Sequence, residues 1–254
     1  MLSASCSSGE TRLVVAAGTT VVDSGFIDHV ADAYEQAHPG VRISVVAEPT
    51  RLALELGREG AADVTLTHAP LQEQAFVDEG GAVAVREVFS SRFILAGPPS
   101  LEGSFAGFEL PEVLREVAAS GIRFVSRGDG SGTHDKEWQN WIEAGIDPRF
   151  DDWYLETGQG MGPTLLVADQ REALVLVEIG AWIAASDSLA LVDMQLDPGA
   201  LDNPYTAMAM SSSKHQAAAL DFVEWLVSPE GRLAISRANE DLFGAIIYAP
   251  ATGG

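Results

Sequence analysis

Short apolar runs alternate along this chain with segments in which apolar residues recur every three or four positions. The runs predict β-strands, the periodic segments predict helices, and their alternation predicts a parallel α/β sheet. In the first part of the chain we expect strands at 13–17, 42–47, 63–67 and 93–96, and helices at 25–37, 52–58 and 71–79.

Two clusters of proline and other turn-forming residues interrupt this pattern, at 97–100 and at 196–204. Between them we expect helices at 111–119, 133–144 and 162–169 and strands at 123–125 and 189–192; after them, a strand at 205–210 and helices at 214–226 and from 229. Because such residues break strands and helices, each cluster marks a crossover. The prediction is a two-lobed α/β fold with a ligand cleft between the lobes: residues 1–10 form a flexible leader, 11–96 with 205–254 form lobe 1, and 97–204 form lobe 2.

Length and charge narrow the class of protein. The chain has 254 residues, 46% of them hydrophobic, which is enough for one sizeable core or two smaller ones. With 15 basic and 37 acidic residues its formal charge is −22. Such a charge repels phosphodiester backbones and anionic headgroups, so we expect no nucleic-acid partner. No stretch approaches the roughly 20 apolar residues needed to span a bilayer.

Cys6 is the single cysteine, so no disulfide framework is possible. Small residues precede it, as in the tail of a bacterial lipoprotein signal, although the basic and apolar regions of a signal peptide are absent. Two interpretations stay open: a lipid-anchored cysteine, or an incidental cysteine in a leader.

Residues 124–134 form the most informative segment, a strand followed by a glycine-rich turn and a helix. Such a turn exposes backbone N–H groups at a helix N-terminus, where a dianion is favoured. Ser131 and Thr133 add hydroxyl donors, Arg127 adds a planar set of charged donors, and Asp129 is close enough in sequence to hold the guanidinium. This is the composition of an oxyanion site, although a tight turn with a capping hydroxyl would have the same sequence.

Two other glycine-containing turns bear on the prediction of a site. Residues 17–25 also join a strand to a helix, and Thr19 and Thr20 are placed to donate at the carboxyl end of that strand, where ligands of open α/β sheets bind. Residues 156–162 contain G-x-G-x-G, which lacks the spacing and context of a dinucleotide fingerprint.

Together these motifs resemble one known family. The matching segments are G-T-T-V-V-D-S-G at 18–25, T-H-A-P at 67–70, V-S-R-G-D-G-S-G-T-H at 125–134, W-Y-L-E-T-G-Q-G-M-G at 153–162 and N-P-Y at 203–205. In this order they are similar to the extracytoplasmic tungstate-binding proteins of tungstate ABC transporters, and they extend over nearly the whole chain.

The resemblance implies a type II periplasmic-binding-protein fold, a monomer that holds tungstate between its lobes through the anion's oxygens and delivers it to permease subunits. Carried over to matching positions, it nominates Thr19, Thr20, Arg127, Ser131, Gly132 and Thr133 as ligand-binding residues. It implies no cofactor and no catalysis. Where the family's first turn usually reads Thr-Thr-Thr-Ser, this chain has Ala-Gly-Thr-Thr at 17–20 and loses two hydroxyls.

His68 is a candidate for selectivity. Phosphate-binding relatives have a similar segment with a carboxylate, which accepts the proton that phosphate still carries near neutral pH. An imidazole carries no negative charge and can donate, which favours a fully ionised anion such as tungstate or molybdate. The alternative is that His68 caps the helix expected to begin near residue 71.

The sequence also bears on other functions. The nearest rivals are a phosphate- or molybdate-binding protein of the same superfamily. A hydrolase using Ser131 and His134 is disfavoured, because the window around Ser131 is not the G-x-S-x-G of a nucleophile elbow. The five histidines show no zinc-ligand spacing.

Overall fold

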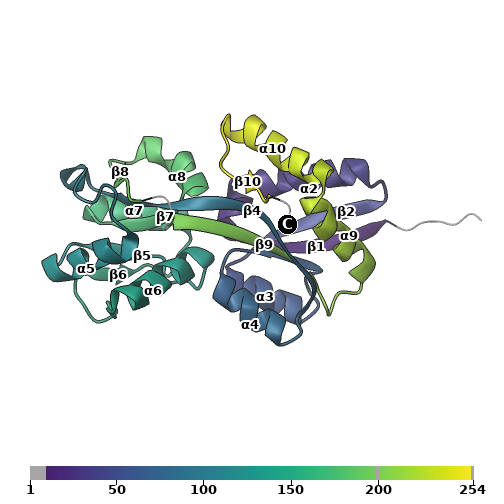
Figure 1. Ribbon diagram of the computed structural model, residues 1–254, viewed down its shortest axis with the longest axis horizontal. Helices are drawn as coiled ribbons and strands as arrows, with labels where there is room; N and C mark the ends of the chain where they lie inside the picture. Colours follow the sequence, from purple (N-terminus) through teal and green to yellow (C-terminus); the bar gives the residue numbers. More distant parts are fainter. Residues whose placement is uncertain (1–9, 198–200, 253–254) are drawn as a thin grey trace, which may run out of the picture.

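The computed structural model describes residues 10–197 and 201–252, and these form two lobes joined by long strands (Figure 1). The leader with Cys6 lies outside the described residues. Within the described part of the chain, no helix combines the length and the apolar character that crossing a bilayer requires.

The first lobe is built from both ends of the chain. Its strands are β1 (Thr11–Ala17), β2 (Val41–Ala47), β3 (Val64–Thr67), most of β4 (Ala82–Gly97), β9 (Asp202–Met210) and β10 (Ala249–Pro250). Its helices are α1 (Thr19–Asp23), α2 (Phe26–Ala37), α3 (Thr50–Arg58), α4 (Pro70–Asp78), α9 (Gln216–Val227) and α10 (Pro229–Phe243).

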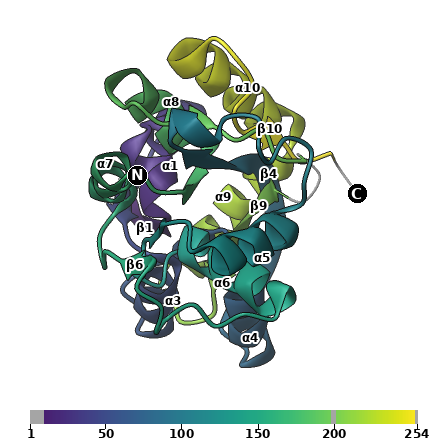
Figure 2. The same cartoon turned by 90° about the vertical axis from the view of Figure 1, so that its left-hand side faces the viewer.

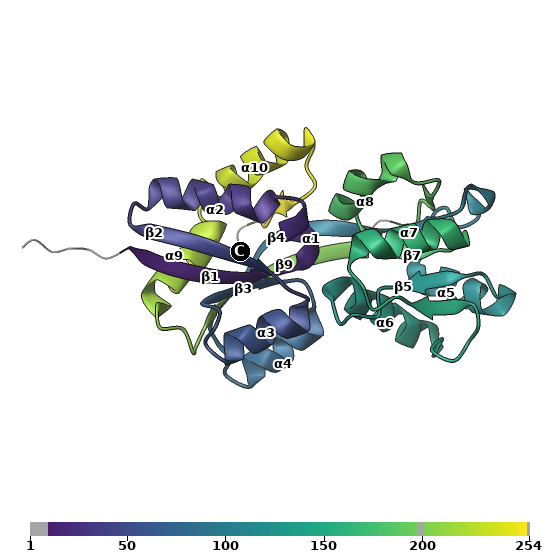
Figure 3. The same ribbon diagram turned by 180° about the vertical axis from the view of Figure 1, so that it is seen from behind.

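Its sheet has the order β10-β4-β9-β3-β1-β2, with β1 parallel to β2 and β3, and β9 antiparallel to β3 and β4. Successive side chains of a strand point to opposite faces, and each face packs on its own helices. Leu13 and Val15 lie in the core with α2, α9 and α10, whereas Ala16 packs with α3. The carboxyl ends of β1, β2 and β3 point toward the second lobe, and α1 lies at that end (Figure 3).

The second lobe has η1 (Pro99–Leu101), α5 (Leu110–Ser120), β5 (Phe124–Ser126), α6 (Gly132–Ala144), β6 (Tyr154–Glu156), α7 (Met161–Arg171), β7 (Val175–Glu178), α8 (Ile179–Ala185), η2 (Ser186–Ser188) and β8 (Val192–Asp193). β5 and β6 pair in parallel, while β7 and β8 pair with the end of β4.

β4 and β9 connect the lobes, and Figure 2 looks along them from the end of the second lobe. From Ala82 to Arg92, β4 pairs with β9; from Phe93 onward it pairs with β7. Its core contacts change at the same place, because Phe89 packs in the first lobe and Phe93 in the second. The lobe limits expected from the sequence, 11–96 with 205–254 and 97–204, stay a prediction about how the chain divides.

The expected α/β class and two-lobed plan are confirmed, and several elements differ. β4 covers 16 residues where the sequence indicated only 93–96. β6, β7, α8 and α1 were not expected, and the strand expected at 189–192 is reduced to Val192–Asp193. The final helix begins as predicted, with Ser228 accepting a hydrogen bond from Gly231 N and proline in the first turn.

Candidate functional site

Four chain segments meet between the lobes, each just beyond the carboxyl end of a strand. They are Gly18–Thr20 after β1, Thr50 and Arg51 after β2, His68 after β3, and residues 127–133 after β5. The first three belong to the first lobe and the last to the second. This is where the topology of an α/β protein leaves room for a ligand.

The turn after β5 is organised by an ion pair. Arg127 is only 2% exposed, and its Nη2 and Nε lie 2.6 and 3.1 Å from Asp129 Oδ2. The other oxygen of Asp129 accepts a hydrogen bond from Ser131 N at 3.1 Å. Asp129 therefore holds the guanidinium, as its position in the sequence suggested, and also the backbone of the turn.

Ser131 and Thr133 lie at the N-terminus of α6. Ser131 Oγ accepts from His134 N at 3.3 Å, so it caps the helix and still has its own proton to donate. Thr133 is 1% exposed, and its Oγ1 has no hydrogen-bond partner in the protein. A buried hydroxyl without a partner is costly unless something absent from the protein chain satisfies it. Together with the unpaired N–H groups of a helix N-terminus, it indicates an anion.

Thr19 and Thr20 approach this turn from the first lobe. They are the first two residues of α1 rather than part of an open turn, with Thr19 half-buried and Thr20 buried. Thr19 Oγ1 accepts from Arg127 Nη2 at 3.3 Å, a direct contact between the two lobes. The structure thus brings Thr19 close to residues 127–133, which we call the arginine turn. Thr19 and Arg127 are 108 residues apart in the sequence.

His68 lies beside the same turn. Its ring stacks on Tyr205, with ring centroids 4.6 Å apart, and Nδ1 lies 2.9 Å from Asn203 Oδ1. A carbonyl oxygen only accepts, so the ring proton of this bond is on Nδ1 and Nε2 keeps a lone pair. Burial, together with the charge of Arg127, lowers the pKa of His68 to about 4, although the bond to Asn203 opposes this shift. The ring is therefore neutral at pH 7.

The position of His68 also explains why residue 132 is a glycine. A Cβ atom on Gly132 would lie 2.6 Å from Cδ2 and Nε2 of His68, too close for any side chain, so only glycine allows the two lobes to meet here. His68 does not cap α4, whose first turn is held by Glu73 accepting from Ala69 N and from the Thr67 hydroxyl.

Thr50 is a candidate that the sequence interpretation missed. It begins α3, is buried, and its Oγ1 has no partner in the protein. The Nε of its neighbour Arg51 lies 3.6 Å from the place where a Cβ atom of Gly130 would stand, so the N-terminus of α3 faces the turn after β5. The available signal was a threonine at the first position of the helix that follows β2, as Thr19 is at the first position of the helix that follows β1.

The arrangement around His134 does not resemble a hydrolase site. A serine nucleophile needs a ring nitrogen of the histidine to accept its proton. Here His134 Nδ1 accepts from Gly130 N at 3.0 Å, and Nε2 lies 3.8 Å from Glu156. Among the described residues no group of three or more His, Cys, Asp or Glu side chains could hold a metal ion.

A buried carboxyl lies at the junction of the lobes. Glu178 ends β7, is fully buried, and accepts hydrogen bonds from Ser91 of β4 at 2.7 Å and Tyr205 of β9 at 2.8 Å. Burial raises its pKa to about 7, while these bonds and the charge of Arg127 oppose the shift. Burial likewise raises the pKa of Glu137 to about 7.

These two carboxyls predict how stability depends on pH. Because their pKa values are raised in the folded state, these carboxyls hold their protons more tightly there than in the unfolded state. Their contribution to the free energy of unfolding is therefore fully present below about pH 4.5 and is lost as pH rises through about 7. Each group changes the free energy of unfolding by about 1.4 kcal/mol per pH unit within that window. In Glu178→Gln, the free energy of unfolding measured with urea should therefore depend less on pH between 5 and 7 than it does in the wild type. The same slope in the variant and the wild type would contradict the burial argument.

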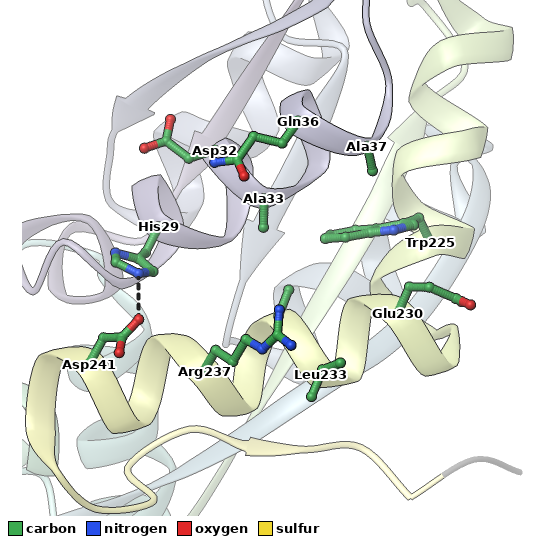
Figure 4. Close-up of a pocket in the computed structure, with 11 residues that line it drawn as sticks. His29, Asp32, Ala33, Gln36, Ala37, Trp225, Glu230, Leu233, Arg237 and Asp241 are labelled. Carbon is green, nitrogen blue, oxygen red and sulfur yellow. Dashed lines mark hydrogen bonds and ion pairs between the residues drawn. The ribbon is translucent and has the colours of Figure 1, made fainter.

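A separate concavity of about 430 Å³ lies on the outer side of the first lobe, between α2 and α10 (Figure 4). Its lining includes Asp32, Glu230 and Asp241, the last paired with His29 at 3.1 Å, and it offers no serine or threonine hydroxyl. Three carboxylates disfavour a dianion there, in spite of Arg237.

Comparisons with known proteins show which family this chain belongs to. A family model described as a PBP superfamily domain matches residues 5–230. The tungstate-binding protein TupA of Peptoclostridium acidaminophilum is 31% identical over 246 residues, covering 94% of this chain and 85% of that protein. An ABC transporter anion-binding protein of Haloferax volcanii is 34% identical, covering 95% and 73%.

Among solved structures, that of the tungstate ABC transporter from Geobacter sulfurreducens superposes with a TM-score of 0.79 at 34% identity, covering 90% of this chain and 99% of that one. The fold is that of the type II periplasmic binding proteins. The chain therefore belongs to the PBP superfamily, as a homologue of the TupA tungstate-binding proteins.

Proposed function

We propose that this chain captures one tetrahedral oxyanion, tungstate, in the cleft between its lobes and delivers it to the permease subunits of an ABC importer. The observation that carries the proposal is the buried, unpartnered hydroxyl of Thr133 at the N-terminus of α6, beside the guanidinium of Arg127. Thr19, Thr20, Ser131, Gly132 and His68 complete the site, and we add Thr50 on the strength of its orphan hydroxyl.

The chemistry of these groups supports a dianion. Removing two negative charges from water is costly unless aligned donors replace the lost hydration. Threonine hydroxyls, unpaired backbone N–H groups and a guanidinium are such donors, and the positive end of α6 adds to them. The site has no activated nucleophile and no cofactor is implied, so the anion leaves as it entered.

Tungstate is the preferred anion because of the named relatives and because the site lacks a carboxylate where His68 stands. Molybdate has the same charge and shape, and is the main competitor. Phosphate still carries a proton near pH 7, and a charged carboxylate accepts this proton more strongly than Nε2 of the neutral His68, which is the only acceptor of that ring.

The importer role implies an extracytoplasmic location and contact with permease subunits. A lipid on Cys6 would hold the protein at the membrane surface. We expect a monomer that binds no nucleic acid, since a formal charge of −22 repels phosphate backbones.

Calorimetric titration tests the proposal. Tungstate should bind at one site per chain with a Kd of about one micromolar or lower. Titrations with molybdate and phosphate under the same conditions provide the comparison. The absence of tungstate binding, or turnover of an ester or phosphoanhydride by the protein, would contradict the proposal.

A further inference from the structure

The strong negative charge of this protein creates a problem for anion capture. A formal charge of −22 repels a dianion that approaches from solution. Salt limits the range of this repulsion to about 8–10 Å at physiological ionic strength. The charges within that distance of the cleft entrance therefore govern how fast an anion enters.

Arg127 contributes little to that long-range attraction. Its guanidinium is buried and lies 2.6 Å from Asp129, so the pair has almost no net charge when seen from outside. His134, the next basic group along the turn, has Glu156 as its nearest acidic neighbour, at 3.8 Å. The turn that holds the anion is thus well supplied with donors and poor in net positive charge.

Arg51 differs from both. It is the second residue of α3, is exposed, and reaches across from the first lobe to the turn of the second. Its Nε lies 3.6 Å from the place where a Cβ atom of Gly130 would stand. Gly130 has a φ of +72° and no side chain, so the Nε of Arg51 lies close to the space that a side chain would fill there.

Arg51 also keeps its charge uncompensated. Among the described residues, no carboxylate lies within 4.0 Å of it, although Glu48 precedes it by three positions. Arg58 on the same helix is the contrast, since it pairs with Glu55 and Glu79, each at 2.7 Å. α3 thus carries one arginine with carboxylate partners and, near Gly130 of the second lobe, one exposed arginine without them.

We propose that Arg51 is the capture residue of this cleft: its free charge attracts the oxyanion to the entrance, and its guanidinium covers the arginine turn when the lobes are together. The inference rests on the proposed function, because it assumes an anion at this turn. It assigns Arg51 to the rate of entry rather than to direct coordination.

Stopped-flow tryptophan fluorescence with sodium tungstate tests the proposal, using the full chain at a series of ionic strengths. In Arg51→Gln we expect the association rate constant at low salt to fall about three- to tenfold, and the difference from wild type to disappear at high salt. Arg51→Lys keeps the charge and should retain most of the rate. Arg58→Gln removes a paired charge from the same helix and should leave the rate unchanged.

An association rate constant of Arg51→Gln equal to that of wild type, with the same salt dependence, would overturn the proposal. So would an equal loss in Arg58→Gln, because it would assign the effect to overall charge. Circular dichroism at each salt concentration confirms that the variants are folded. If the wild type itself gives no tungstate signal and no calorimetric heat, the proposed function fails instead, so the two failures are distinguishable.

Discussion

Replacing Arg127 with alanine is expected to weaken tungstate binding at least tenfold. A hydrogen bond to a charged group contributes about 1.5–3 kcal/mol, and about 1.4 kcal/mol corresponds to a factor of ten in Kd. Arg127 is buried beside Thr19 and the N-terminus of α6, so no solvent-exposed group can replace its donors. Calorimetry on the purified variant measures the loss.

Asp129→Asn is the comparison that separates two roles of Arg127. If Arg127 only pins the turn through its bond to Asp129 Oδ2, removing the carboxylate charge should damage binding about as much as removing the arginine. If Arg127 contacts the anion, its loss should be the larger of the two. Unchanged affinity in Arg127→Ala would refute a ligand role for this residue.

His68→Asp is expected to lose more than tenfold in tungstate affinity and to gain measurable phosphate binding. At pH 7 His68 is neutral, whereas a carboxylate repels a fully ionised anion and accepts the proton of a partly protonated one. The bond from Nδ1–H to Asn203 modifies the reason first inferred for this selectivity. Since Nε2 keeps a lone pair, the absence of negative charge, and not an imidazole donor, is what favours tungstate.

The matched control is His68→Asn, which also removes the ring and its stacking on Tyr205 but adds no charge. It should weaken tungstate less than the aspartate does and should not gain phosphate. Competition calorimetry with the two anions measures both variants. A His68→Asp protein with wild-type tungstate affinity and no phosphate binding would assign the discrimination to another part of the cleft.

Local sequence patterns were enough to predict the helices and strands that repeat cleanly, and the glycine-rich turn after β5. They were not enough for β4, because its first six residues are exposed or only partly buried and include the charged Arg86 and Glu87. Its length depends on pairing with β9, more than 100 residues away. The run at 173–185 is apolar except for the buried Glu178, so periodicity could not divide it into β7 and α8.

Some residues of the candidate site could likewise be predicted from a local motif, and others could not. Arg127, Asp129, Ser131 and Thr133 belong to one continuous motif, and their mutual arrangement follows from it. Thr50 and Arg51 lie in an unremarkable helix start, and only the packing of the first lobe against the second brings them to the turn. A local sequence pattern cannot predict a contact between residues that belong to different lobes.

The anomalous scattering of tungsten in crystals grown with sodium tungstate tests the central claim most directly. We expect one strong peak per chain between the lobes, within hydrogen-bonding distance of Thr133 Oγ1 and Arg127. A sole peak in the concavity between α2 and α10, or no peak at a concentration that saturates binding in solution, would contradict it.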